Sequence, residues 1–293
     1  TQSDVFLGLL TQIESLSVMG WGALHDTTLL FARMLRHLSL KDWAVSGIES
    51  SESTPLMNLE SVAVVDLVRS SFFDFANPIL ISNSESVTIM DISLEVYSSS
   101  IAIVRISESR KIYLAEITGR YSTAAFFSMQ GVVTTNIRDS TFLNSTLQVP
   151  DSGAITWKNP PASEQDTLFY LVRTLMAFHN ADKGSALYID GAHQVTFEDA
   201  RFVNNSAATV GGAVFVQGAH TVRVLRSDFQ CNSALLSGGA IHTLSSTEFF
   251  SSSFDHNSAT SGMGGAIFAR VDEPLATGLA ISNCSFTANW ALS

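Results

Sequence analysis

Residues 202–218 read Phe-Val-Asn-Asn-Ser-Ala-Ala-Thr-Val-Gly-Gly-Ala-Val-Phe-Val-Gln-Gly, and this stretch holds the two motifs that decide the fold. The first motif is Phe-x-x-Asn, and the second is Gly-Gly-Ala followed by a β-branched residue. The motifs alternate along the C-terminal part of the chain. Their members are Phe202, Asn205, Phe229, Asn232, Phe254, Asn257, Phe286 and Asn289 for the first motif, and Gly211, Gly212, Gly238, Gly239, Gly264 and Gly265 for the second. A motif that returns at a nearly constant interval predicts one structural unit stacked on itself.

The interval of the repeat indicates which kind of stacked unit is present. The alanine of each triplet, degenerate copies included, stands at 154, 186, 213, 240 and 266, which gives steps of 32, 27, 27 and 26 residues. Weaker markers at Ala125, Ala102 and Pro78 extend the rhythm toward the N-terminus. Short β-branched runs such as Val87–Ile92 and Ile112–Ile117 fall between these markers. A leucine-rich repeat would show Leu-x-x-Leu-x-Leu, which is absent, and a propeller blade needs about 40–45 residues.

The sequence therefore predicts an all-β chain that forms one right-handed parallel β-helix of about ten coils, each of 22–32 residues. At about 4.8 Å per coil this is a rod roughly 50 Å long. We expect residues 1–50 to form an irregular or capping coil, with a helical cap over Leu29–Leu38. Residues 51–141 are expected to form degenerate coils and residues 142–293 clear coils, all within one domain of 1–293. We expect the chain to be a segment of a longer protein.

Each motif residue has a structural role in such a coil. Phenylalanine is expected to point inward and stack on the phenylalanine of the next coil. Asparagine suits a turn because it tolerates left-handed backbone geometry, and repetition at one place makes a ladder of side-chain amides. The glycine pair suits a sharp corner with positive φ and close backbone approach.

One column of residues after the triplet is a candidate for binding. The residue after the alanine of each triplet is aliphatic and is expected to point into the core. Because side chains alternate along a strand, the next residue points outward, and these residues are Tyr188, Phe215, His242 and Phe268, one per coil. An exposed aromatic column is a plausible docking stripe for a protein or a glycan. Self-stacking, or a covering loop, is the alternative.

Two further residue pairs are candidates, one for a metal site and one for a disulfide. His193 and His220 follow Gly-Ala 27 residues apart, so they are expected roughly 5 Å apart, but no third ligand shares their register. Surface stacking at a turn is favoured, and no metal or other cofactor is predicted. Cys231 and Cys284 are expected roughly 10 Å apart, beyond the reach of a disulfide, and are predicted to be free thiols packed near the core.

Composition narrows the class of partner. The net charge is −11 with only 16 Lys and Arg residues, which argues against nucleic-acid binding. Apolar residues make up 46%, enough for a large core. No signal peptide and no stretch of 18 apolar residues is visible, so membrane attachment is expected only through a missing segment.

The alternating motifs resemble the GGA[ILV] and FxxN repeats of the chlamydial polymorphic membrane proteins. The clear match covers residues 178–293, and degenerate copies carry it back to 142. The resemblance implies a secreted or surface-exposed parallel β-helix that acts as an adhesin or structural protein at the cell surface or outside the cell. It implies no catalytic residues.

The function expected is a non-enzymatic scaffold that contacts protein or glycan partners with its sides and assembles at its ends with like or unlike subunits. A pectate-lyase-like enzyme acting on polysaccharides is one alternative, but Asp199, Asp228 and Asp255 stand at different offsets from their phenylalanines and form no acid pair. A subunit of an extracellular filament or sheath is the other alternative. Sequons at Asn144, Asn204 and Asn283 make glycosylation possible.

Overall fold

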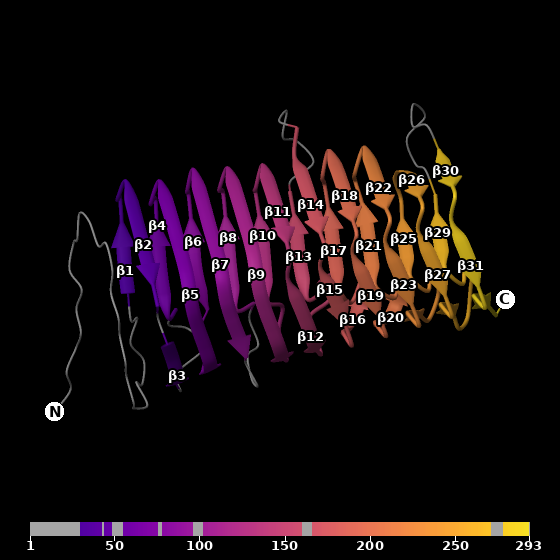
Figure 1. Cartoon of the computed structure of the whole chain (residues 1–293), viewed down its shortest axis with the longest axis horizontal. Helices are drawn as coiled ribbons and strands as arrows, with labels where there is room; N and C mark the ends of the chain where they lie inside the picture. Colours follow the sequence, from indigo (N-terminus) through magenta and orange to yellow (C-terminus); the bar gives the residue numbers. More distant parts are fainter. Residues whose placement is uncertain are drawn as a thin grey trace.

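Stacked parallel strands form a rod in the computed structural model, which describes residues 30–42, 44–48, 55–75, 78–95, 102–159, 166–270 and 278–292. Figure 1 shows the coils side by side along the long axis, from β1 at one end to β31 at the other. Every strand pair is parallel, and no helix occurs in these residues. The predicted all-β parallel β-helix is confirmed. Within the same residues, no helical segment has the length and hydropathy of a membrane span.

Three strips of strands run along the rod. The first is a ten-stranded sheet: β1 (Leu30–Arg33), β4 (Met57–Glu60), β6 (Ile79–Ser82), β8 (Val104–Ser107), β10 (Phe127–Gln130), β13 (Ile155–Lys158), β17 (Leu187–Asp190), β21 (Val214–Gln217), β25 (Ile241–Thr243) and β29 (Ile267–Ala269). The second is a five-stranded sheet: β16 (Asn180–Lys183), β20 (Ser206–Val210), β24 (Ser233–Ala234), β28 (Ser258–Ala259) and β32 (Trp290–Ala291).

The third strip is bent along its length into two arms. Three long strands cross the bend: β5 (Val64–Phe75), β7 (Ser86–Glu95) and β9 (Lys111–Ser122). In the other coils each arm has its own strand. The first arm continues in β2 (His37–Lys41), β11 (Thr134–Arg138), β14 (Leu168–Val172), β18 (Gln194–Glu198), β22 (Thr221–Leu225), β26 (Ser246–Phe250) and β30 (Leu279–Ser282). The second arm continues in β3 (Ala44–Ile48), β12 (Thr141–Ser145), β15 (Leu175–Ala177), β19 (Arg201–Val203), β23 (Asp228–Gln230), β27 (Ser253–Asp255) and β31 (Ser285–Thr287).

The register between coils follows the repeat. Val214 pairs with Ile241 and Ile241 pairs with Ile267, so equivalent triplets face each other across the sheet. In the ten-stranded sheet, the shortest sequence separation between paired residues of adjacent coils is that from Met57 to Ile79, and the longest is that from Ile155 to Leu187. These steps of 22 and 32 residues are the limits expected from the sequence. A repeat aligned in this way buries the same face in every coil.

The helical cap predicted over Leu29–Leu38 is wrong for its described part; Leu29 lies outside the described residues. Residues 30–33 form β1, with alternating buried and exposed side chains, and β2 starts at His37. The apolar residues here fit both a helical and an alternating pattern. Pairing of Leu30 with Met57 decides in favour of the strand, because it supplies hydrogen bonds and burial together.

The interior is one continuous apolar cluster that runs the length of the rod, from Leu30 to Ala266. Its residues come from the ten-stranded sheet and from both arms of the third strip, and its largest buried side chains are Trp157 and a set of phenylalanines. On the last coil Leu279, Ile281 and Phe286 are half exposed and line a shallow hollow with Ile267.

Candidate interaction surface

The phenylalanines of the repeat form a stack inside the rod, which we call the inner Phe column. Phe202, Phe229 and Phe254 are fully buried, and ring centroids lie 4.7 Å apart for the first pair and 4.9 Å for the second. Phe286 continues the stack 4.9 Å from Phe254. The rings are within 7° of parallel in each pair. The predicted stacking is confirmed, and these rings act in packing rather than in ligand binding.

The asparagines of the repeat form a hydrogen-bonded ladder of side-chain amides. Asn232 Nδ2 donates to Asn257 Oδ1 at 3.0 Å and to the carbonyl oxygen of Phe202 at 3.0 Å. Asn232 Oδ1 accepts from the backbone nitrogen of Asn205 at 3.1 Å and from Asn205 Nδ2 at 2.9 Å. The same pattern links Asn257 to Asn289. The predicted Asn ladder is confirmed.

The repeat asparagines lie in turns between strands, as expected, but the left-handed backbone expected for them is wrong. Positive φ occurs one residue earlier, at Asn204, Cys231, His256 and Ala288. The repeat asparagines instead satisfy buried polar groups of the neighbouring coils with their side chains. A buried amide must make such bonds, which explains the type of residue at this position.

The two glycines of each triplet have different roles, and both were expected. The first glycine has positive φ: +64° at Gly211 and Gly238. The second leaves no room for a side chain, because a Cβ on Gly212 would lie 1.9 Å from the carbonyl oxygen of Gly239. One glycine supplies the corner and the other allows the coils to stack.

Phe178 and Asn180, which the spacing suggests as a shortened Phe–Asn unit, do not occupy the columns. Met176 takes the place of the phenylalanine, paired with Phe202, and His179 takes the place of the asparagine. His179 is completely buried, donates from Nε2 to the carbonyl oxygen of Phe142 at 3.0 Å, and accepts from Ser145 Oγ at 2.7 Å. Burial lowers the pKa of His179 to about 3, so the ring is neutral.

The candidate binding column of Tyr188, Phe215, His242 and Phe268 stacks as one file. Successive centroids are 5.3, 5.4 and 4.7 Å apart, and the rings are within 27° of parallel. The side chains lie outside the main core cluster, as alternation predicts. However, Tyr188 is 3% exposed, Phe215 4% and His242 8%. The expectation of an exposed stripe is therefore wrong; only Phe268 is partly exposed.

The preceding corner of each coil covers this column. Lys183 lies over Phe215, with its Nζ 5.7 Å from the ring centroid, and pairs with Asp151 at 2.6 Å. Ser237 Oγ lies 2.8 Å from His242 Nδ1. Desolvation raises the pKa of Tyr188 to about 12 and lowers that of His242 to about 4. The covering residues, such as Lys183 of β16, Lys158 of β13 and Ser237, lie on other strands and coils, which alternation along one strand cannot reveal.

A different column presents aromatic side chains to solvent, and we call it the exposed corner column. Its members occupy one position per coil at the end of the second arm: Tyr121, Asn144, Phe178, Asn204, Cys231, His256 and Ala288. All have positive φ and all are exposed. Tyr121 is 48% exposed and Phe178 52%. A signal for Phe178 was present in the sequence, since Phe178-His179-Asn180 is one residue short of the motif.

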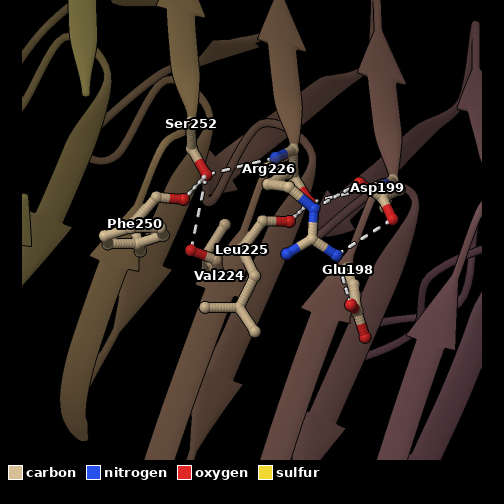
Figure 2. A network of polar contacts seen from close by, with 9 residues as sticks. Glu198, Asp199, Val224, Leu225, Arg226, Phe250 and Ser252 are labelled. Atoms are coloured by element: carbon tan, nitrogen blue, oxygen red, sulfur yellow. Dashed lines mark hydrogen bonds and ion pairs between the residues drawn. The ribbon is translucent and has the colours of Figure 1, made fainter. Parts of the chain in front are cut away.

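Charged residues gather at the bend between the two arms, where every coil has one residue with positive φ. These residues form the bend column: Asp42, Arg69, Asp91, Glu116, Asp139, Arg173, Asp199, Arg226, Ser251 and Asn283. Figure 2 shows Arg226 between Asp199 and Glu198, with Asp199 Oδ1 at 2.9 Å from Nε. Arg173 pairs with Asp139 at 2.7 Å and lowers the pKa of that carboxyl.

The two cysteines are free, as predicted, but only Cys284 contacts the core. Cys284 takes the place of a serine in a ladder beside the bend: Sγ donates to the carbonyl oxygen of Ser282 at 3.2 Å and accepts from the backbone nitrogen of Ser252 at 3.5 Å. Ser252 Oγ makes the equivalent contacts one coil earlier (Figure 2). Cys231 is exposed, which contradicts the expected packing near the core, because it occupies the exposed corner column.

The remaining candidates do not assemble into a reactive centre. His193 and His220 stack with centroids 5.2 Å apart, and Asp166 lies 3.5 Å from His193. Among the described residues, no group of three His, Cys, Asp or Glu could hold a metal. Asp199, Asp228 and Asp255 lie apart, beside Arg226, Arg201 and His256 respectively. All three sequon asparagines are exposed, with φ between 52° and 56°.

Comparison with protein families gives one match. Residues 251–270 match the model of the Chlamydia polymorphic membrane protein repeat. This segment contains Phe254, Asn257 and the pair Gly264–Gly265, so it spans one copy of each motif. No curated protein and no solved structure matches the chain. In this segment the chain is therefore similar to the polymorphic membrane protein repeat, and its parallel β-helix fold agrees with the fold that the motifs of this repeat imply.

Proposed function

We propose that this chain is a non-enzymatic scaffold or adhesin, located at a cell surface or outside the cell, that binds protein or glycan partners along its sides. The repeat match and the β-helix fold support a surface scaffold. The observation that carries the proposal is the exposed corner column. Tyr121 and Phe178 present about half of their surface to solvent on the side of the rod. Exposed aromatic side chains are typical of contact surfaces.

The absence of enzymatic activity is part of the proposal. Its support is that the motif residues act in packing and that Asp139 and Asp199 of the bend column are each paired with an arginine. A glycan-cleaving enzyme needs two carboxylates converging on one bond, or a cation site. Incubation of the chain with a panel of acidic polysaccharides, with and without Ca²⁺, should release no oligosaccharide; measurable cleavage would overturn this part.

The binding function can be tested with matched variants. Labelled chain produced in bacteria, so that no N-linked glycan covers the exposed corner column, is applied to glycan arrays and to cell surfaces, and its binding is compared with that of Tyr121→Asn and Phe178→Asn. Asparagine adopts positive φ readily and occupies the same column at Asn144 and Asn204, so the backbone should be unaffected. We expect the wild-type chain to bind and each variant to bind at least several-fold more weakly.

Two outcomes would contradict the proposal: no binding to any surface, or binding that both variants retain in full. A control variant, Glu248→Gln, changes an exposed charge on a different face and should bind as the wild type does. Sedimentation of the same samples over a range of concentrations measures self-association, which we propose as a second mode of contact at the ends of the rod.

A further inference from the structure

We propose that Asn144 and Asn204 carry N-linked glycans, and that the exposed rings of Tyr121 and Phe178 are platforms on which the first sugars of these glycans pack. This inference rests on the proposed extracellular or surface location, since a secretory route supplies the modification. It adds a modification site to the scaffold. The carrying observation is the order of residues along the exposed corner column.

Aromatic residues and sequon asparagines alternate in this column. Tyr121, Asn144, Phe178 and Asn204 occupy the same corner of four consecutive coils. Adjacent strands lie about 4.8 Å apart, so each sequon asparagine has an aromatic ring one strand spacing away. Asn144 lies between two such rings.

The two aromatic residues place large rings at an exposed position of the coil. Phe178 has φ of 61° and Tyr121 has φ of 53°, a conformation that glycine and asparagine favour and bulky side chains avoid. Both side chains leave about half of their surface in water. The conformation belongs to the fold, because Cys231, His256 and Ala288 share it at the same corner; what distinguishes Phe178 is a large ring that is half exposed there. A sugar packed on the ring would supply the missing burial.

The chemistry of a pyranose fits this surface. Its C–H face is apolar and packs on an aromatic ring, whereas its rim of hydroxyls needs polar neighbours. Such neighbours flank the column two residues further along the chain: Thr146 and Asn180 are exposed and Ser206 is partly exposed. No charged side chain belongs to this part of the corner column. A neutral sugar therefore matches the site better than an acidic one.

The modification uses a lipid-linked oligosaccharide pyrophosphate as donor. Asn144 Nδ2 forms a bond to the anomeric carbon of the first sugar, and the bond from that carbon to the pyrophosphate oxygen breaks. The lipid pyrophosphate leaves with the electron pair, and Nδ2 loses one proton to a base of the transferring enzyme. The hydroxyl two residues after the asparagine, on Thr146 or Ser206, completes the acceptor sequence.

The experiment uses the full chain, fused to a secretion leader in a eukaryotic cell line and also produced in bacteria without glycans. Peptide mass spectrometry measures occupancy at each asparagine, and thermal unfolding gives the midpoint for four chains: wild type, Thr146→Ala, Phe178→Asn and the double variant. Thr146→Ala removes the sequon and leaves Asn144 in place. The same four chains produced in bacteria carry no glycans, so subtracting their thermal midpoints removes the effect of each substitution on the polypeptide itself.

We expect glycans at Asn144 and Asn204 in most secreted molecules. Loss of the Asn144 glycan should lower the midpoint by about 2–4 °C when Phe178 is present and by less than about 1 °C in the Phe178→Asn background. Ser285→Ala, which removes the sequon of Asn283 in the bend column, should show no coupling to Phe178. The inference is overturned if Asn144 is unmodified in the secreted chain, or if its glycan stabilises both backgrounds equally. The glycan-free bacterial chain tests partner binding separately, so failure here is distinguishable from failure of the scaffold function.

Discussion

Replacement of Asn232 by alanine is the most direct test of the Asn ladder. The side chain makes four hydrogen bonds in a fully buried position: two to Asn205, one to Phe202 and one to Asn257. Alanine removes all four. Two hydrogen bonds of the ladder remain: Asn257 Oδ1 still accepts from the backbone nitrogen of residue 232, and Asn205 Nδ2 still donates to the carbonyl oxygen of Met176.

Two buried groups then lose the bond from Asn232: the backbone N–H of Asn205 and the carbonyl oxygen of Phe202. Only the N–H of Asn205 is left unsatisfied, because the carbonyl oxygen of Phe202 still lies in the parallel pairing of β19 with β23. One unsatisfied buried group costs about 1–3 kcal/mol, so the free energy of unfolding should fall by about 1–3 kcal/mol. Urea unfolding followed by far-UV circular dichroism measures this change. Because a solenoid can unfold in parts, hydrogen exchange of the 201–206 segment should be measured as well, and it should become faster.

The control is Asn204→Gly, one residue along from the ladder. Asn204 is exposed with φ of 52°, which glycine adopts without strain, so we expect a change below about 0.5 kcal/mol. Asn232→Asp is the second variant: it keeps the acceptor atoms but loses both donated bonds and buries a carboxylate. It should be at least as destabilising as alanine at neutral pH. A loss below about 1 kcal/mol for Asn232→Ala, with unchanged exchange, would refute the reasoning.

The remaining predictions concern packing, pH and backbone approach. Phe215→Ala should lower the free energy of unfolding by about 3–5 kcal/mol, because the Phe215 ring is buried. The Phe178 ring is half exposed, so Phe178→Ala should change the free energy of unfolding by less than about 1 kcal/mol. Equal effects of the two variants in urea unfolding would contradict the assigned burial. The pKa of His179 is about 3 in the fold, so only the unfolded chain takes up a proton between pH 6.5 and pH 3, and the free energy of unfolding should fall as the pH drops through this range. The loss at pH 5 is about 2 kcal/mol. Urea titration at several pH values should show that His179→Asn removes this part of the pH dependence. Gly239→Ala should destabilise by about 3 kcal/mol or more, because its Cβ would lie 2.0 Å from the carbonyl oxygen of Gly265; a thermal midpoint equal to that of the wild type would show that the coils can separate without cost.

The clear repeats could be predicted because one residue type recurs at one place in the coil. Where Phe, Asn and Gly-Gly return at 25–27 residues, the alignment of motifs is also the register of strands, as Phe229 opposite Phe254 shows. The prediction weakened where the motif degenerates. At Phe178 the spacing suggested an inner ring, but the coil places Met176 and His179 inside and turns Phe178 outward.

The amino-acid sequence by itself determined the stacked parallel coil, its period, the inner Phe column, the Asn ladder and the close approach of the coils at the glycine pair, because each depends only on a residue meeting its own copy one coil away. Tertiary structure alone decided which outward columns are covered. Tyr188 and Phe215 point away from the core, as alternation requires, yet corner residues such as Lys183 bury them. Exposure depends on atoms contributed by other coils and corners, and a local pattern carries no information about those.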